Sequence, residues 1–262
     1  MYNFEFTKPR TVEEAVGAMA SEGAQALGGG QTLLPTMKQR LASPEVLVSM
    51  TGIAEMVGVA VRGNTLTIGG ATTHAQVAAE AAESYPALAA LAANIGDPAV
   101  RNRGTIGGSL ANNDPAACYP AGALGSGATI TTNKRDVAAD DYFQGMFETA
   151  LDEGEIITSV SFPVPEKANY QKFDQPASRF ALVGVFVAKT ADGVRVAVTG
   201  ASNGGVYRWT DAETALNGDF SESALDGMSG NADDMIADLH GSAKYRAHLV
   251  GVFTRRAVTA SR

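Results

Sequence analysis

The sequence has 262 residues, enough for one large domain or two smaller ones with buried cores. Hydrophobic residues make up 45% and charged residues 18%, as in ordinary globular proteins, and the formal net charge is −8. This acidic balance argues against nucleic acid as a partner, because nucleic-acid-binding surfaces carry clustered basic residues, and it disfavours docking on an anionic membrane.

Metal-binding residues are scarce. Cys118 is the single cysteine, so this chain alone can form no intramolecular disulfide and no all-cysteine cluster or zinc site. His74, His240 and His248 lie far apart in no metal-binding spacing, so we expect structural roles for them and no metal in this chain. The N-terminus lacks the pattern of a signal peptide, and no apolar run of about eighteen residues is present. We therefore expect a soluble, cytoplasmic protein.

The pattern of apolar residues and turn signals predicts an α+β chain. Thr11 and Glu14 have the spacing of a capping box, and Asp192-Gly193 is a strong hairpin signal. Prolines and charges at 163–168 predict a connection between an N-terminal portion, 1–168, and a smaller C-terminal one, 169–262. Helices are predicted at 12–19, 33–41, 73–82, 86–94, 116–124 and 242–260, and strands at 4–6, 24–27, 46–48, 65–68, 128–131, 156–162, 180–188 and 194–200.

Two glycine-containing loops stand out among the 29 glycines, Leu27–Leu34 (LGGGQTLL) and Thr105–Ser109 (TIGGS). Consecutive small residues can present several backbone N–H groups to one anion, such as a phosphate. The first loop is not a complete GxGxxG motif, because Leu33 stands where the third glycine belongs. Spacing alone leaves two interpretations open: tight turns between strands, or two loops that grip a pyrophosphate from both sides.

Longer stretches around these loops resemble a known family. Leu27–Leu41, Ile95–Gly108 and Ala111–Pro115 are similar to the flavin loops of the carbon monoxide dehydrogenase medium subunits, a family that includes the FAD subunits of xanthine dehydrogenases. Further similar segments are Gly154–Thr158, Tyr170–Lys172, Ser178–Val183 and Tyr245–Leu249, so that the resemblance covers nearly the whole chain.

The resemblance implies a fold, a cofactor and partners. The fold is a PCMH-type FAD-binding domain of two α/β subdomains (1–168), followed by a small α+β domain with a three-stranded sheet (169–262). The chain would bind FAD, whereas a large subunit holds a molybdopterin cofactor and a small subunit holds two [2Fe–2S] clusters. Electrons would pass through FAD to NAD, oxygen, a quinone or a carrier protein. The expected assembly is a dimer of heterotrimers.

The resemblance also implies which residues bind FAD. The two loops would hold its pyrophosphate and ribityl chain, Ile95 and Ile157 would line the flavin, and Lys172 would lie near the pyrimidine end of the ring. A cation there would stabilise the negative charge of the reduced flavin. The alternative for Lys172 is an exposed lysine on a strand. The implied cofactor-binding residues are Leu27, Gly28, Gly29, Gly30, Gln31, Thr32, Leu33, Leu34, Ile95, Thr105, Ile106, Gly107, Gly108, Ser109, Asp114, Cys118, Ile157 and Lys172.

Cys118 is a departure from the family, which often has a second aspartate four residues after Asp114. A thiol is a weaker hydrogen-bonding group than a carboxylate, so Cys118 is either a flavin neighbour with altered contacts or a small buried residue. Arg101 and Arg103 either meet the cofactor or a partner, or position the loop between them. No residue has the pattern of a nucleophile or general base. Two other functions stay open: a stand-alone flavin oxidoreductase, and a flavin-free scaffold subunit.

Overall fold

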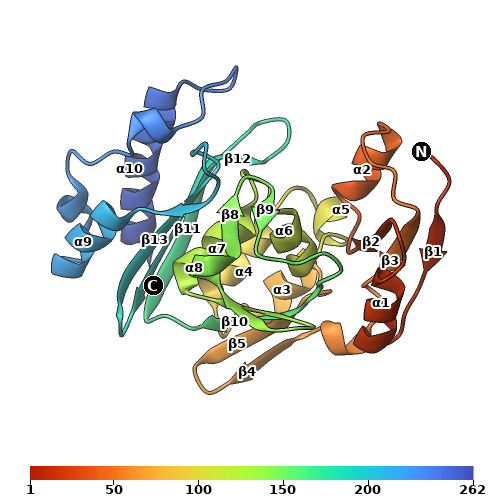
Figure 1. Cartoon of the computed structure of the whole chain (residues 1–262). Coiled ribbons are helices and arrows are strands. Elements are labelled where there is room, and N and C mark those ends of the chain that lie inside the picture. The colour runs from red at the N-terminus through yellow and green to blue at the C-terminus, as the bar shows by residue number, and fades with distance from the viewer. Residues whose placement is uncertain (262) are drawn as a thin grey trace.

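The computed structural model of the protein describes residues 1–261 (Figure 1). It contains a three-stranded parallel sheet, a five-stranded antiparallel sheet, a four-stranded antiparallel sheet and a two-stranded hairpin, with helices packed between and beside them. The α+β class is confirmed.

The N-terminal sheet has the order β1-β3-β2 and is formed by β1 (Glu5–Thr7), β2 (Ala24–Leu27) and β3 (Val46–Ser49). Helix α1 (Val12–Met19) packs against it. The Thr11 side chain accepts a hydrogen bond from the backbone N–H of Glu14, whereas the Glu14 carboxylate accepts from Arg10 rather than from Thr11. The capping box is therefore only half formed. Helix α2 (Leu33–Lys38) follows the first glycine loop.

The five-stranded sheet brings distant segments together. A 3-10 turn (Ala54–Met56) leads from the N-terminal sheet into it. Strand β10 pairs with β5 on one side and β6 on the other, so that the end of the N-terminal portion closes onto its middle. In spatial order the strands are β4 (Val59–Arg62), β5 (Thr65–Gly69), β10 (Ile157–Pro163), β6 (Thr129–Thr132) and β7 (Asp136–Ala138).

A layer of helices covers one face of this sheet. All residues of α7 are buried, because it lies between the five-stranded sheet and the C-terminal sheet, and Tyr85 and Ser126 form a hydrogen bond of 2.7 Å within this layer. The helices are α3 (His74–Glu80), α4 (Pro86–Ala93), α5 (Pro98–Arg101), α6 (Ile106–Asn112), α7 (Cys118–Ser126) and α8 (Ala139–Tyr142). The hairpin of β8 (Phe143–Gly145) and β9 (Glu148–Thr149) follows them.

The C-terminal sheet has three long strands, as expected, and a fourth strand of two residues joins its edge. The strands are β11 (Lys167–Asp174), β12 (Ala181–Thr190), β13 (Gly193–Thr199) and β14 (Tyr207–Arg208). One face packs on α4 and α7, and the long helix α10 (Ala243–Ala260) covers the other (Figure 1). The shorter elements beside α10 are α9 (Thr210–Gly218) and the 3-10 turns Glu222–Leu225 and Ala232–Asp234.

The Arg195 side chain ties the C-terminal sheet to the helical layer. It donates two hydrogen bonds, of 3.0 and 2.8 Å, to the Leu124 carbonyl near the C-terminus of α7. It also pairs with the Asp140 carboxylate of α8 at 2.7 Å. A cation is favoured at a helix C-terminus by the helix dipole, so this contact stabilises the junction between the two parts of the chain.

The hairpin predicted at Asp192-Gly193 exists, but its register differs by one residue. Thr190 pairs with Gly193, so Ala191 and Asp192 form the turn and Gly193, with φ of +128°, begins β13. The elements that were not predicted are the strands β4, β7, β8, β9, β11 and β14 and the helices α5, α6, α8 and α9. Within residues 1–261, no helix has the length and apolarity needed to cross a membrane.

Glu155, in the turn before β10, is a buried carboxylate held by hydrogen bonds. It accepts from Thr132 Oγ1 at 2.6 Å and from the Asp152 backbone N–H at 2.8 Å, and it pairs with Arg135 at 3.1 Å. Burial raises the pKa of Glu155, but the hydrogen bonds from Arg135, Asp152 and Thr132 outweigh it and lower the pKa to about 2. The ionised form therefore stabilises the folded state.

We expect Glu155→Gln to lower the free energy of unfolding at pH 7 by about 2 kcal/mol, after a discount for the half-exposed Arg135. Because the folded-state pKa lies below the unfolded value, the difference from wild type should persist above pH 4.5 and shrink as the pH falls toward 2. Urea unfolding across this range measures it, with exposed Glu153→Gln as the control. An E155Q defect that does not change with pH would contradict the prediction.

Candidate functional site

A cavity of about 580 Å³ lies where the N-terminal sheet, the helical layer and the C-terminal sheet meet. Its volume falls within the range of cofactor sites, roughly 300–1,000 Å³. All of the residues predicted to bind the cofactor line it except Leu34 and Ile106. The side chain of Leu34, in α2, packs beside Gly30. The side chain of Ile106 is buried in the hydrophobic core. The fold thus gathers residues from 27 to 172 around one space.

The first glycine loop presents unbonded backbone donors to this cavity. Within residues 1–261, the N–H groups of Gly29, Gly30, Gln31 and Thr32 donate no hydrogen bond to the protein. Gly30 has φ of +71°, and the Gln31 side chain donates to the Gly29 carbonyl at 3.2 Å, which folds the loop back on itself. A row of unbonded N–H groups is suited to binding an anion such as a phosphate.

The loop owes its position to close packing against the second glycine segment. A Cβ atom on Gly29 would overlap the Arg103 carbonyl and lie 2.6 Å from the Gly104 Cα. No side chain fits there. The first loop can therefore approach residues 103–105 only because residue 29 is glycine.

The second glycine segment is not a loop but the start of helix α6. Thr105 is the N-cap, and its hydroxyl accepts from the Gly108 N–H at 3.2 Å. The N–H groups of Ile106, Gly107 and Ser109 bond to carbonyls within the chain. The prediction of two loops with free N–H groups is therefore wrong for this segment, because the buried Ile106 and Leu110 and the Thr105 cap favour a helix.

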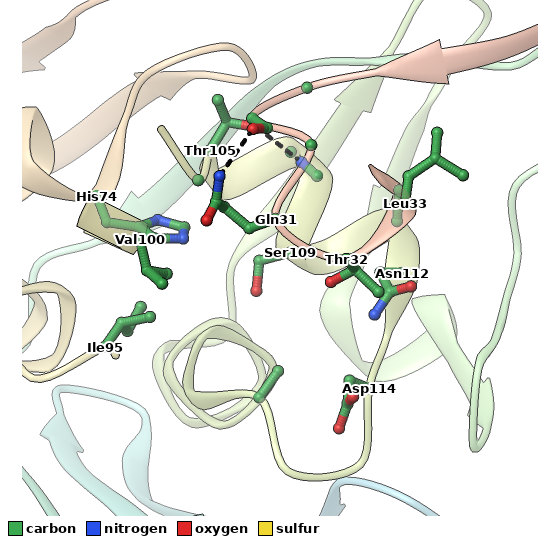
Figure 2. A pocket seen from close by; sticks show the side chains of 18 of the residues that line it. Gln31, Thr32, Leu33, His74, Ile95, Val100, Thr105, Ser109, Asn112 and Asp114 are labelled. Carbon is green, nitrogen blue, oxygen red and sulfur yellow. Dashed lines mark hydrogen bonds between the residues drawn. The ribbon is translucent and has the colours of Figure 1, made fainter. Parts of the chain in front are cut away.

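Side chains supply the polar groups on the α6 side of the cavity. Figure 2 shows Ser109, Asn112 and Asp114 around the cavity, with Asn112 beside Thr32 of the first loop. Asp114 also accepts from the Ala116 N–H at 2.8 Å, which shapes the turn before α7. Apolar side chains that line the same cavity include those of Ile95, Val100, Ile156 and Ile157. The site therefore combines an anion-binding end with walls suited to a flat apolar ring.

Lys172 is not an exposed strand lysine, since only 1% of its side chain is accessible. Its ammonium donates to the carbonyls of Asn94 at 2.6 Å and Arg179 at 2.8 Å and pairs with Asp174 at 2.9 Å. An ammonium has three donors, and these three oxygens are its shortest contacts. Lys172 therefore joins the end of α4 to the loop 175–180 in the cavity wall.

Cys118 is a small buried residue that also lines the cavity. Its Sγ is 3.7 Å from Lys172 Nζ. Burial raises the pKa of the Cys118 thiol, and the nearby Lys172 only partly offsets this. The thiol is therefore protonated at neutral pH and provides a weak, uncharged contact.

Arg101 positions the loop before α5 rather than lining the cavity. Its guanidinium donates to the carbonyls of Ile95 at 3.1 Å and Gly96 at 2.9 Å. Arg103 contributes its backbone carbonyl beneath Gly29. Of the interpretations left open for these arginines, Arg101 thus fits the loop-positioning one.

Several lining residues were not predicted, and His74 is the most notable. We expected a structural role for it, yet its ring lies in the cavity wall. Nothing in its sequence neighbourhood signals this, because α3 and the loops meet only in the folded chain. The other lining residues outside the prediction are Gln25, Ala26, Met50, Met56, Gly70, Gly96, Val100, Gly104, Ala111, Asn112, Ala116, Ala117, Phe147, Leu151, Glu155, Ile156, Ser178, Arg179 and Phe180.

Residues 2–165 match the protein family described as the FAD binding domain in molybdopterin dehydrogenase. The chain belongs to this family. It is 33% identical to the carbon monoxide dehydrogenase medium chain of Afipia carboxidovorans, over 98% of this chain and 96% of that one. It is 34% identical to the nicotine 6-hydroxylase medium subunit of Paenarthrobacter nicotinovorans, over 97% and 95% of the two chains.

Solved structures agree with this assignment. The chain matches a structure of Cu,Mo-CO dehydrogenase with a TM-score of 0.88 and 31% identity, over 98% of this chain and 96% of that one. It matches quinoline 2-oxidoreductase from Pseudomonas putida 86 with a TM-score of 0.88 and 27% identity, over 98% and 96%. The expected PCMH-type fold is confirmed, and the chain carries an FAD-binding domain.

The cavity fits FAD in its chemistry. The unbonded N–H groups at 29–32 suit a diphosphate, and Ile95 and Ile157 suit the two faces or edges of an isoalloxazine ring. Both glycine segments thus serve the same site, one through its backbone and the other through its side chains.

Gly29→Ala should abolish FAD retention, because the added methyl group must push the first loop away from residues 103–105. We expect at least a hundredfold weaker binding in a titration followed by flavin fluorescence. Gly17→Ala is the matched control, since a Cβ there meets nothing within 4 Å in α1. Tight FAD binding by G29A would show that the packing of these loops does not shape the site.

Lys172→Met should loosen the loop 175–180, because the Asn94 and Arg179 carbonyls lose their shared donor. We expect the amides of this loop to exchange with deuterium about tenfold faster in the FAD-free protein. Lys134→Met, which removes a cation whose ion pair is exposed, is the control. Unchanged exchange at 175–180 would mean that other contacts hold the loop.

Proposed function

We propose that this chain is the medium, FAD-binding subunit of a cytoplasmic heterotrimeric molybdenum hydroxylase. Its partners are a large subunit with the molybdopterin cofactor and a small subunit with two [2Fe–2S] clusters, assembled as a dimer of heterotrimers. Bound FAD supplies the redox chemistry that connects one-electron iron–sulfur carriers to an external acceptor, which is NAD, oxygen, a quinone or a carrier protein. The chain is then an oxidoreductase subunit, and the centre that hydroxylates the substrate belongs to the large subunit.

The observation that carries the proposal is the row of unbonded N–H groups at 29–32, within a cavity on a chain that matches medium subunits over nearly its whole length. Relatives with this organisation include a glyceraldehyde dehydrogenase medium chain of Sulfolobus acidocaldarius, 29% identical over 97% of this chain. The chain thus resembles medium subunits of complexes that act on different substrates. This supports a shared electron-transfer role for it, and a choice of substrate made elsewhere in the complex.

The residues of the chain would act by binding and orienting the cofactor. We assign the diphosphate to the N–H groups of 29–32, the ribityl chain to the side of Ser109 and Asp114, and the ring to Ile95 and Ile157. The Lys172 ammonium lies in the cavity wall next to Cys118, where we place the ring end of the cofactor and where a cation would favour negative charge on a reduced ring. The expected domains, 1–168 for the cofactor and 169–262 for the wall that carries Lys172, are part of this proposal.

The two alternatives have no observation in their favour. A flavin-free scaffold would not need the unbonded donors of the first loop. A stand-alone flavin oxidoreductase would need a catalytic acid or base beside the ring, and one carboxylate in the cavity wall, that of the buried Glu155, is engaged by Arg135, Thr132 and Asp152.

Visible absorption spectra of this chain and of its assembled complex test the proposal. We expect flavin bands at about 370 and 450 nm and about one FAD released per chain on denaturation. Mixing the FAD-loaded chain with the chemically reduced iron–sulfur subunit should bleach the 450 nm band, and adding NAD, oxygen or a quinone should restore it. If chain and complex are both colourless and bind no added FAD, the scaffold reading replaces this one. Flavin that is not bleached by the reduced partner would instead favour a stand-alone enzyme.

A further inference from the structure

His74 places a buried polar atom in the cavity wall without a partner. The residue is 5% exposed and lines the cavity. Its Nδ1 atom has no hydrogen bond to any residue from 1 to 261. Buried polar atoms are nearly always paired, because leaving one unpaired costs free energy. Nδ1 itself is enclosed by protein atoms, whereas the other ring nitrogen, Nε2, has no hydrogen bond to residues 1–261 and is not enclosed, so the ring offers an unpaired nitrogen to a ligand in the cavity.

The ring is held in place from behind. The backbone N–H of His74 donates to the Gly104 carbonyl at 2.9 Å, and the ring lies 5.3 Å from that of Tyr119, centroid to centroid. A Cβ on Gly104 would lie 2.5 Å from His74 Nε2, so residue 104 leaves room for the imidazole. Figure 2 shows the ring reaching into the cavity, near Gln31 and Val100.

The imidazole is uncharged at neutral pH. Burial and the nearby Arg101 guanidinium lower the pKa of His74 to about 4. A neutral imidazole has one nitrogen that donates and one that accepts. A hydroxyl, which both donates and accepts, can pair with either tautomer of this ring, whereas a phosphate oxygen, which only accepts, can pair only with the tautomer that carries its proton on the nitrogen facing the ligand.

The position of the ring indicates which part of the cofactor this hydroxyl belongs to. The unbonded N–H groups at 29–32 already suit the diphosphate, and Ile95 and Val100 beside His74 are apolar. The imidazole lies between these two regions (Figure 2). In a flavin dinucleotide, the segment between the diphosphate and the ring is a polyol.

We propose that the His74 imidazole positions the cofactor by forming a hydrogen bond with a hydroxyl of the polyol chain of FAD. This inference rests on the proposed function, because it requires FAD in the cavity. It adds to the glycine loops a side chain that distinguishes a flavin dinucleotide from other diphosphates.

Titration of the FAD-free, full-length chain with FAD and with ADP tests the inference, because ADP carries the diphosphate but no polyol. We expect His74→Phe, which keeps an aromatic ring against Tyr119, to weaken FAD binding about tenfold and to leave ADP binding within twofold of wild type. His74→Asn, which can still donate and accept, should recover part of the loss. Tyr119→Phe is the control, since this buried hydroxyl does not line the cavity.

Nitrogen-15 NMR of the wild-type imidazole gives a readout that needs no substitution. The His74 ring nitrogens should shift on addition of FAD and not on addition of ADP. Equal FAD affinity in H74F and wild type, equal losses for FAD and ADP, or imidazole signals that ignore FAD would each overturn the inference and leave the proposed function intact. A wild-type chain that binds no FAD would overturn both.

Discussion

The contact between Gly29 and the backbone of residues 103–105 is the constraint on which the site depends. It brings the turn after β2 of the N-terminal sheet against the start of α6 in the helical layer, at a distance that only a glycine allows. Because the first loop is held from behind, its N–H groups at 29–32 need not bond to the rest of the chain and can face the cavity. A row of unbonded N–H groups in a cavity wall is suited to binding an anion.

The division of labour between the two glycine segments follows from this contact. The first segment has φ of +71° at Gly30, and its N–H groups at 29–32 have no hydrogen-bond partner within residues 1–261. In the second segment the N–H groups donate to the Thr105 hydroxyl and to the carbonyls of residues 70, 72 and 105. The second segment is thus a rigid support. It presents side chains such as Ser109 to the cavity and holds the first loop in position.

The C-terminal sheet completes the cavity by a different kind of interaction. A nearly inaccessible ammonium on β11 reaches across to the end of α4 and to the loop between β11 and β12, so one charge links three segments of the wall. Buried charges are tolerated only when paired and hydrogen-bonded, and Lys172 meets this condition with two carbonyls and Asp174. Lys172 lies near Cys118 at the start of α7. At the end of α7, Arg195 joins the C-terminal sheet to the Leu124 carbonyl and to Asp140 of α8.

Much of the local structure was predictable from the sequence. Helix α1, strand β2, the buried helix α4 and the long helix α10 have strong periodicity or clear caps, and they lie within a residue or two of the predicted bounds. The short edge strands and the one-turn helices were not predictable, because tertiary packing rather than local propensity stabilises elements of this length.

The sequence by itself determined the α+β class, the family resemblance and the residue types at the two glycine segments, since these depend on local composition and spacing. Only the tertiary structure decided which backbone donors stay unbonded, that Lys172 is buried against Asn94 and Arg179, and that His74 faces the cavity. These properties arise from contacts between segments far apart in the chain. A hydrogen-bond partner or a burial imposed across such a distance leaves no local pattern in the sequence.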